Sequence, residues 1–594
     1  MPASDLYQKL EQSWQTKGRT GSLQSPQKFN NQDFTHLRDY CLSRGLLFED
    51  DTFPAHVSSI GPNLLSEDKL SRLQWKRPMM IERNPHLIVD GVSRFDIIQG
   101  EIGDCWVLAA LGSLTLQRQF LENVLPKDQG FKENYAGIFH FRFWHFGDWV
   151  DVVIDDRLPF LNGRYLSVQP RSRNEFWPSL LEKAYAKLRG SYQNLHWGYI
   201  SDALVDLTGG VQVQFLLQKP PSDLQEIIKA AAKSQCLMGC TMPGGQSIGK
   251  MELKNGLVKG HAYTVTGATE IPYKNGWEDI IRVWNPWGHG EWRGPWSDGS
   301  PQWDRVPAEY KKDLCEDKDD GEFWMSGHAF AEQFFSLCIC NNTPSFLDFG
   351  DQRGTRWSLA MYVNQWARGL TAGGSAFSRN PQYFVQVEEP DLKNYNVVVS
   401  LIRKPVNNMP DAQILFTGFL IFRVSSIRWY GVAFFSQYKY KVLKYGFNVS
   451  TRDVTNYFYL SPGTYVVVPT TSEEGQEAEF LLRIFLRQAE LFQNGFQDIF
   501  RRVEGTGSGF LDISDLKNAV QRAGLAVNGQ LLHLTALRYS DSSMRICLPD
   551  FVCCMIRLET MASKSCSWLA RVLWGSQNME NMGLHCINHI SQYP

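Results

Sequence analysis

The sequence predicts a multidomain α+β protein, in which a mixed body is followed by an antiparallel β-sandwich and then by a helical module. The first observation is length, because 594 residues are enough for about three to five domains. The second is composition: hydrophobic residues make up 43% and charged residues 21%, which is ordinary for globular domains and not for disordered chains. The third is a change of pattern along the chain.

The pattern changes divide the chain into four stretches. Residues 1–30 are polar and predict a linker with a short helix at most. The α+β body, 31–342, mixes a helical run at 106–116 with strand-like runs at 135–146 and 149–154. Residues 343–490 hold short β-branched and aromatic runs separated by turn signals, at 383–387, 397–402, 414–424 and 465–468. Residues 491–594 show helical periodicity, at 496–502 and 513–520.

Charge and composition exclude several classes of protein. Lys and Arg number 60 against 62 Asp and Glu, so we expect no nucleic-acid partner. The amino terminus lacks an apolar signal segment, and no apolar run reaches the roughly 18 residues that span a membrane. The 12 cysteines form neither a disulfide framework nor a zinc-spaced cluster. We therefore expect a cytoplasmic protein with reduced thiols.

A cysteine stands where the helical run of the α+β body begins, in the motif Gln99-Gly100-Glu101-Ile102-Gly103-Asp104-Cys105-Trp106. Unsatisfied N–H groups and the positive end of a helix dipole favour a thiolate there, so the pKa of Cys105 should fall. Cys105 is therefore a candidate nucleophile. Taken alone, a cysteine beside a tryptophan is more often a structural core residue.

A histidine and an asparagine follow at the ends of two strand-like runs. His261 lies in Gly260-His261-Ala262-Tyr263, and Asn285 begins Asn285-Pro286-Trp287-Gly288. The order Cys, His, Asn, with 156 residues from 105 to 261 and 24 from 261 to 285, is typical of papain-like thiol proteases. We expect His261 to act as general base and then general acid, and Asn285 to hold its ring. Gln99 and the N–H of Cys105 would stabilise an oxyanion.

These motifs resemble those of calpains, the calcium-activated cysteine proteases of the cytosol. Further matching stretches are Glu182–Lys187, Asp320–Met325 and Trp366–Gly374, so that the resemblance covers roughly residues 30 to 560. The resemblance implies a linker at 1–30, a papain-like core with a first lobe at 31–210 and a second lobe at 211–342, a C2-like β-sandwich at 343–490 and a truncated, degenerate penta-EF-hand region at 491–594. A place among the atypical calpains of the 13 or 14 kind is a further hypothesis.

The resemblance also implies that each lobe binds one Ca²⁺. In the first lobe the matching ligands are the backbone carbonyls of Val89 and Gly91 and the carboxylates of Asp96 and Glu175. In the second lobe they are Glu291, Asp298, Asp320 and Glu322, with the carbonyl of Lys318. Hard oxygen ligands of mixed type suit Ca²⁺. Any single surface carboxylate is usually only solvated, so this assignment depends on the resemblance.

The resemblance implies roles for three further residues in opening and closing the cleft between the lobes. The resemblance implies that Arg94 pairs with Glu322 and so couples the two calcium sites, and that Trp287 wedges into the cleft of the calcium-free state. Trp106 would line the same cleft. The alternatives are a surface arginine and two ordinary core tryptophans.

The carboxyl-terminal half departs from the family pattern. The acidic loop of the sandwich is reduced to Glu388–Asp391, so that contact with membrane phospholipid and a plain spacer role both stay open. Only the third and fourth EF-hands are recognisable. The third has Glu504, Thr506 and Asp515 at loop positions one, three and twelve, and the fourth has Asp541 as its single carboxylate. Because the tail 563–594 does not resemble a fifth hand, pairing with a small regulatory subunit is not expected.

Three functions are compatible with this sequence. The first is a calcium-dependent intracellular cysteine endopeptidase that makes limited cuts in protein substrates. The second is a proteolytically silent, calcium-responsive adaptor, in which the triad is present but does not align. The third is another papain-like enzyme such as a transglutaminase, for which the asparagine in third place fits less well than an aspartate.

Overall fold

The computed structural model of the chain describes residues 21–172, 174–244, 251–315, 318–349, 355–387, 395–405, 415–425, 430–437, 451–489, 503, 510–522, 529–540, 545–547, 551 and 554. These residues form a large compact unit up to 349 and from 357 to 487, and a small unit that takes in Thr355, Arg356 and the residues after Arg487. Within them, no helix combines the length and the hydropathy needed to cross a bilayer. The acidic stretch Glu388–Asp391, the loop positions Glu504, Thr506 and Asp541, the run 496–502 and the tail 563–594 lie outside the described residues.

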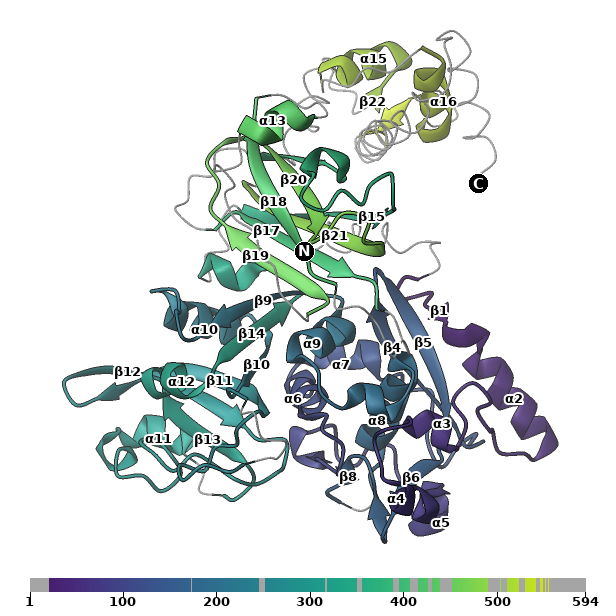
Figure 1. Cartoon of the computed structure of the whole chain (residues 1–594), viewed down its shortest axis with the longest axis vertical. Helices are drawn as coiled ribbons and strands as arrows, with labels where there is room; N and C mark the ends of the chain where they lie inside the picture. The colour runs from purple at the N-terminus through teal and green to yellow at the C-terminus, as the bar shows by residue number, and fades with distance from the viewer. Residues whose placement is uncertain are drawn as a thin grey trace. The chain divides into compact units, whose positions relative to one another are not determined.

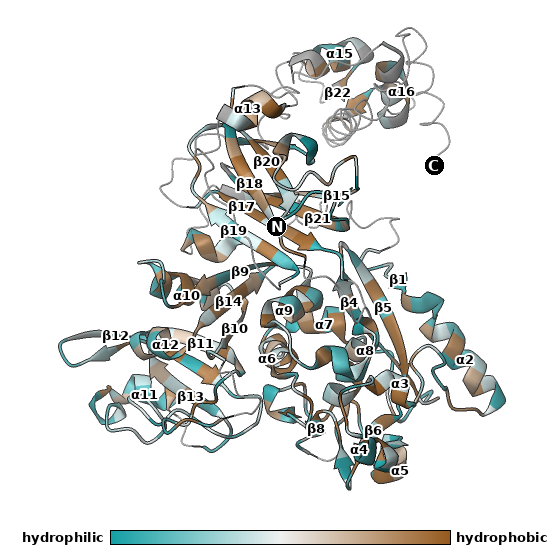
Figure 2. Ribbon diagram, viewed as in Figure 1, coloured by the Kyte–Doolittle hydropathy of each residue, from teal (hydrophilic) through white to brown (hydrophobic). Residues whose placement is uncertain are grey.

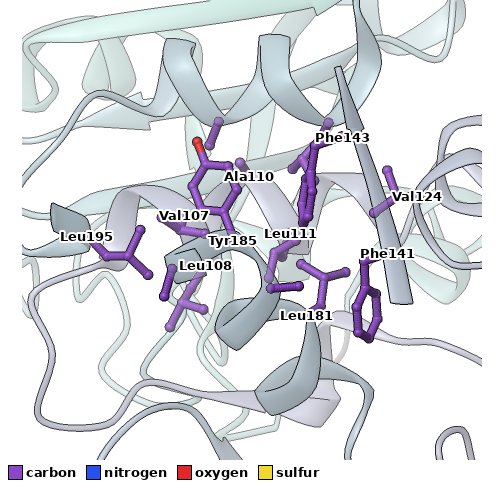
Figure 3. Packing of buried hydrophobic residues seen from close by; sticks show 14 of the residues in the cluster. Val107, Leu108, Ala110, Leu111, Val124, Phe141, Phe143, Leu181, Tyr185 and Leu195 are labelled. Carbon is purple, nitrogen blue, oxygen red and sulfur yellow. The ribbon is translucent and has the colours of Figure 1, made fainter. Parts of the chain in front are cut away.

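The first lobe is built around helix α6 (Cys105–Leu114), every residue of which is buried. A helix that is apolar on all sides is typical of one surrounded by protein. Figure 3 shows side chains of α6 packed against those of β4 (Ile138–His145) and α8 (Trp177–Arg189) in one hydrophobic cluster. The helix predicted at 106–116 and the strand predicted at 135–146 are thereby confirmed.

The remaining elements of the first lobe surround this core (Figure 1). They are β1 (Gln27–Lys28), α2 (Phe34–Arg44), α3 (Val57–Ile60), α4 (Glu67–Arg72), β2 (Gln74–Lys76), α5 (Pro78–Ile81), β3 (Ile97–Ile98), α7 (Arg118–Val124), β5 (Asp148–Asp155), β6 (Leu158–Leu161), β7 (Arg164–Tyr165), β8 (Gln169–Pro170) and α9 (Ile200–Thr208). Strand β1 pairs in parallel with β5, which the polar composition of residues 1–30 did not predict. Backbone pairing depends little on side-chain polarity, so composition alone missed it.

The second lobe is a six-stranded antiparallel sheet with the strand order β13-β12-β11-β10-β14-β9. Its strands are β9 (Val211–Leu216), β10 (Leu237–Thr241), β11 (Ala262–Tyr273), β12 (Gly276–Trp284), β13 (Glu322–Ser326) and β14 (Ser336–Asn341). Its helices are α10 (Leu224–Lys233), α11 (Ala308–Leu314) and α12 (Gly327–Gln333). The boundary between the lobes at 210/211 stays a prediction.

Two sheets with the orders β15-β21-β17-β19 and β16-β20-β18 form the sandwich. Their strands are β15 (Thr355–Trp366), β16 (Tyr383–Val387), β17 (Val397–Arg403), β18 (Thr417–Val424), β19 (Asp453–Phe458), β20 (Gly463–Thr471) and β21 (Ala478–Ala489), and α13 (Val432–Gln437) follows β18. Figure 2 shows that the central strands are strongly hydrophobic. Val397, Val399 and Leu401 face the sandwich core, whereas Val398 joins the core of the second lobe. The sandwich therefore packs directly against the α+β body.

The small unit contains α15 (Ile513–Arg522) and α16 (Gly529–Tyr539), together with the short strands β22 (Phe510–Leu511) and β23 (Ile546–Cys547). The two strands pair antiparallel, with Leu511 opposite Ile546. Asp515 and Asp512 exchange hydrogen bonds between side chain and backbone, which makes a capping box at the start of α15. The predicted loop residue Asp515 is therefore engaged in capping the helix.

Candidate active site

Cys105 is the first residue of α6 and is 8% exposed. The helix lies at the contact between the lobes, because Thr264 Oγ1 in β11 donates to the carbonyl of Ala109 at 2.6 Å. The N–H of Met238 in β10 also donates to Ser113 Oγ at 2.8 Å. Gly112 is needed here, since a Cβ on it would meet Thr264 and Trp284. The helix that presents Cys105 is thus bound to the sheet of the other lobe.

The pairing of β11 with β12 brings His261 and Asn285 together. Thr264 lies opposite Trp284 in this antiparallel ladder, His261 directly precedes β11 and Asn285 directly follows β12. Both side chains are almost completely buried, and His261 Nε2 lies 2.8 Å from Asn285 Oδ1. Residues that are 24 positions apart therefore form a direct hydrogen bond.

The neighbours of Asn285 determine which way its amide points. Its Nδ2 donates to the carbonyls of His289 at 2.8 Å and Gly290 at 3.0 Å, which can only accept. Its Oδ1 accepts the N–H of Trp287 at 3.1 Å. The oxygen of the amide therefore faces His261, and the hydrogen bond between them requires the proton on Nε2.

Trp287 connects the two halves of this site. Its indole ring is 4.9 Å from the His261 ring, centroid to centroid, and its Nε1 donates to Gln99 Oε1 at 2.8 Å. The amide nitrogen of Gln99 in turn donates to the carbonyl of Ile102 at 2.9 Å and to Asp104 Oδ1 at 3.3 Å. Gln99 is therefore held from the second lobe at its oxygen and from the loop before Cys105 at its nitrogen.

Tyr263 lies beside His261 in the core of the second lobe, although sequence reasoning did not single it out. Its ring packs edge-on against His261 at 4.9 Å. Burial raises the pKa of Tyr263, and the thiol of Cys105 makes a smaller contribution in the same direction. The alternation of Gly260-His261-Ala262-Tyr263 was the only signal in the sequence, since it puts positions 261 and 263 on one face of a strand.

Trp106 differs from Trp287 in its surroundings. It is 2% exposed, and its Nε1 donates to the carbonyl of Leu195 at 2.8 Å. A Cβ on Gly198 would collide with its ring, and Tyr185 packs edge-on against it at 6.0 Å. Trp106 thus belongs to the packed core of the first lobe.

The carboxylates expected to bind calcium in the first lobe lie close together. Glu175 Oε1 accepts the N–H of Val89 at 2.9 Å, and Asp96 Oδ2 accepts the N–H of Ser93 at 2.7 Å. Burial, with repulsion from Asp96, raises the pKa of Glu175 to about 7, and burial also raises the pKa of Asp96. Gly91 has φ +99°, which shapes the turn beside them. Two desolvated carboxylates beside backbone carbonyls suit a hard cation.

The set expected in the second lobe is only partly assembled. Burial, with repulsion from Asp298, raises the pKa of Glu291 to about 7, and Glu291 Oε1 accepts the N–H groups of Asp320 and Gly321 at 3.1 and 2.9 Å. Asp298 Oδ2 accepts the N–H of Lys318 at 3.2 Å. Across the part of the chain that the structure describes, no group of three or more His, Cys, Asp or Glu side chains has a geometry ready to hold a metal ion.

Glu322 is engaged elsewhere, because it forms a two-pronged ion pair with Arg94 of the first lobe. Arg94 Nε lies 2.9 Å from Glu322 Oε1 and Nη2 lies 2.6 Å from Oε2, and the two side chains are 14% and 13% exposed. Arg282 Nε approaches the same carboxylate at 3.7 Å. A paired, mostly buried arginine and glutamate therefore join the lobes on the side of the predicted calcium ligands.

Three family models match the chain in sequence order. The model described as "Calpain family cysteine protease" matches residues 48–341, "Calpain large subunit, domain III" matches 362–485, and "Calpain-13-like, C-terminal EF-hand" matches 493–565. These three matches, taken in order, agree with the protease core, the β-sandwich and the EF-hand region that the sequence predicted for a mixed α+β protein.

Relatives match over most of the chain. Calpain-13 of Rattus norvegicus is 41% identical over 90% of this chain and 94% of its own length. Calpain clp-1 of Caenorhabditis elegans is 42% identical over 76% of this chain and 60% of its own length, and the Calpain-1 catalytic subunit of Bos taurus is 35% identical over 90% and 91%. The resemblance noted from the motifs is confirmed, and the similarity to Calpain-13 and to the Calpain-13-like EF-hand model agrees with the hypothesis of the 13 or 14 kind. The chain belongs to the calpain family of cysteine proteases.

Proposed function

We propose that this calpain is a calcium-dependent cysteine endopeptidase that makes limited cuts in protein substrates. The observation that carries the proposal is the hydrogen bond from His261 to Asn285 in the lobe opposite Cys105. A histidine with its ring held by an oriented amide, in the lobe opposite a cysteine at a helix start, supports thiol proteolysis. Membership in a family of cysteine proteases supports it independently.

The two ring nitrogens of His261 have separate tasks in this mechanism. Nε2 donates to Asn285, so Nδ1 exchanges the proton with the thiol of Cys105. The resulting thiolate attacks the carbonyl carbon of the substrate, and the amine leaves with the proton returned by His261. The start of α6 favours the thiolate, because N–H groups in the first turn of a helix carry partial positive charge.

Gln99 is the side-chain donor for the oxyanion of the tetrahedral intermediate in this proposal, together with the backbone N–H of Cys105. The contact between Gln99 Oε1 and Trp287 Nε1 orients the amide, and its nitrogen, which donates to Ile102 and Asp104 in this structure, would exchange one of these hydrogen bonds for one to the oxyanion. Trp287 covers the His261 ring and thereby limits the access of water to the hydrogen bond with Asn285.

Calcium enters the proposal as the ligand that stabilises the aligned lobes. Val89, Gly91, Asp96 and Glu175 would hold one ion, and Glu291, Asp298, Lys318 and Asp320, with Glu322, a second. The cation would supply positive charge to carboxylates that burial and mutual repulsion leave with raised pKa values. Arg94 and Glu322 join the lobes beside both sets, so binding at either set favours the aligned state.

The test is hydrolysis of denatured casein by the full-length protein, with Ca²⁺ varied from zero to millimolar. Cys105→Ala is the active-site variant, and Cys315→Ala is the matched control, because Cys315 lies in the second lobe beside α11. We expect a calcium-dependent rate that Cys105→Ala abolishes and Cys315→Ala retains.

Two results would contradict the proposal. Cleavage that survives Cys105→Ala would show that another group is the nucleophile. A folded protein without cleavage at any calcium concentration would favour the silent adaptor.

A further inference from the structure

A strained and exposed tryptophan lies beside the segment that presents Cys105. Trp197 stands shortly before α9 and is 60% exposed. Its φ is +72°, in the left-handed region that bulky side chains rarely adopt. Such a backbone costs free energy, and the mechanism described above does not use the residue. Strain of this kind at an active site calls for a functional explanation.

A second tryptophan with the same backbone conformation shows what is unusual here. Trp296 has φ +71° but is only 2% exposed. Its ring packs against Trp303 and Tyr273, with centroids 5.2 and 4.9 Å apart. Burial of a large aromatic ring offsets the strain at Trp296. At Trp197 most of the residue faces solvent, so core packing does not account for it.

Gly103 holds Trp197 close to the candidate nucleophile. The N–H of Trp197 donates to the carbonyl of Gly103 at 3.1 Å, and the N–H of Gly103 donates to His196 Nδ1 at 3.1 Å. A Cβ on Gly103 would collide with the His196 ring, so the close approach requires glycine. Gly103 stands two residues before Cys105, and their Cα atoms are therefore at most about 7.6 Å apart.

The start of α6 fixes the residues on both sides of Trp197. Trp106 Nε1 donates to the carbonyl of Leu195 at 2.8 Å, and a Cβ on Gly198 would collide with the Trp106 ring. The ring of Trp197 itself packs edge-on against His196, with the centroids 5.4 Å apart. Trp197 is thus an exposed aromatic residue on a firmly held backbone.

We propose that Trp197 is a specificity-determining residue, which contacts a bulky aliphatic or aromatic side chain of the protein substrate near the bond that is cleaved. The inference deepens the proposed protease function and rests on it. An extended chain advances about 3.3 Å per residue, so a substrate with its scissile carbonyl at Cys105 brings a side chain to Trp197 within about four residues of that bond. The indole ring offers a flat apolar surface for such a side chain to cover.

The first test compares the full-length wild type with Trp197→Gly at saturating Ca²⁺. Glycine suits the left-handed backbone, so the variant removes the ring without adding strain. Cleavage sites in denatured casein are mapped by mass spectrometry. We expect the wild type to favour leucine, isoleucine or an aromatic residue at one fixed position near the cleaved bond, and Trp197→Gly to lose this preference.

Two decapeptides of glycine and serine, one with a single central leucine and the other with alanine there, measure the size of the preference. We expect kcat/KM of the wild type to favour the leucine peptide by about tenfold or more, and this ratio to fall below about threefold in Trp197→Gly, mainly through KM. Trp197→Phe keeps an aromatic ring and should retain the preference. Trp277→Ala is the matched control, because Trp277 is an exposed tryptophan on β12.

A second variant guards against a folding defect. Asparagine also tolerates a left-handed backbone, so Trp197→Asn should have a Tm close to that of the wild type and the same loss of preference as Trp197→Gly. A folded Trp197→Gly or Trp197→Asn with the wild-type cleavage sites and the wild-type KM would overturn the inference, while the protease proposal would stand.

A further readout does not depend on proteolysis. The two decapeptides, labelled with fluorescein, are bound to Cys105→Ala with Ca²⁺ and followed by fluorescence anisotropy. We expect the leucine peptide to bind more tightly than the alanine peptide, and the difference to vanish when Trp197→Gly is added. If this holds while the wild type does not cleave casein, the protease proposal fails and the contact with Trp197 stands. Equal binding of the two peptides to Cys105→Ala overturns the inference.

Discussion

The two lobes hold their parts of the candidate site by different means. In the first lobe, Cys105 is placed by the start of a fully buried helix, and Asp104 and Glu182 are two carboxyl groups buried in the same lobe. In the second lobe, His261 and Asn285 are placed by the register of two antiparallel strands and by backbone carbonyls. One half of the site thus depends on the packing of a buried helix, and the other half on strand register and neutral hydrogen bonds.

The contacts between the lobes also differ from one another in charge. At α6 the contact is a neutral hydrogen bond from Thr264 to the carbonyl of Ala109. On the side of the predicted calcium ligands the contact is ionic, between Arg94 and Glu322. The energy of an ion pair depends strongly on nearby charge, whereas that of a neutral hydrogen bond depends on it little. A bound cation would therefore act on the contact between Arg94 and Glu322 and not on the one between Thr264 and Ala109. The comparison therefore predicts which substitutions change the chemistry and which change the response to calcium.

The largest effect is expected from Asn285→Ala, which removes the group that orients His261. We expect kcat to fall by roughly 10²-fold to 10⁴-fold, because the ring loses its fixed tautomer and orientation. Asn341→Ala is the matched control, since Asn341 ends β14 in the same sheet and donates to the carbonyl of Ser234. Steady-state kinetics on casein measure both. A kcat within about threefold of wild type for Asn285→Ala would contradict the assignment.

Arg94→Ala tests the ionic contact between the lobes. The variant leaves the mostly buried Glu322 with its longer contact to Arg282 at 3.7 Å, so we expect the rate at limiting calcium to fall about tenfold and the calcium midpoint to rise. Calcium titrations of activity provide the measurement. Arg72→Ala, which breaks an exposed ion pair with Asp68 on α4, should leave the midpoint unchanged. An unchanged midpoint in Arg94→Ala would show that the pair does not couple the lobes to calcium.

Glu182→Gln should change how stability depends on pH. The folded protein keeps the proton on Glu182, whereas the unfolded chain releases it above about pH 4.5, so the free energy of unfolding falls as pH rises, until the raised pKa is passed. The slope is about 1.4 kcal/mol per pH unit for one proton. The variant should have a flatter profile in urea unfolding between pH 5 and the raised pKa. Glu226→Gln on α10, at an exposed position, is the control, and equal slopes in wild type and Glu182→Gln would contradict the protonated state.

The smallest effect is expected from Trp287→Phe, which keeps an aromatic ring over His261 and loses the hydrogen bond to Gln99. The loss of one such bond corresponds to about 1 kcal/mol, or roughly fivefold in kcat. Trp277→Phe at the exposed hairpin end of β12 is the matched control. A kcat equal to wild type for Trp287→Phe would show that Trp287 does not position Gln99.

Much of the architecture could be predicted from local pattern. The helix after Cys105 and the strands β4, β16, β17 and β20 follow from apolar periodicity, which a chain expresses whatever its partners are. The polar segment before residue 30 was misjudged, because the pairing of β1 with β5 uses backbone groups that side-chain composition does not reveal. Trp106 and Trp287 have the same side chain, yet only Trp287 lies at the contact between the lobes. Whether a residue is buried in a core or lies at a contact between lobes depends on the whole fold and cannot be read from the residue type alone.

The sequence by itself determined the family, the order Cys105, His261, Asn285 and the type of each domain, because motifs and hydrophobic periodicity are local properties of a chain. Only the tertiary structure decided that Trp287 donates to Gln99, that Thr264 donates to the carbonyl of Ala109, and that Trp106 donates to the carbonyl of Leu195 in the core of the first lobe. Each of these is a contact between residues far apart in the chain, whose distance and ionisation depend on burial and on neighbours that the fold brings together.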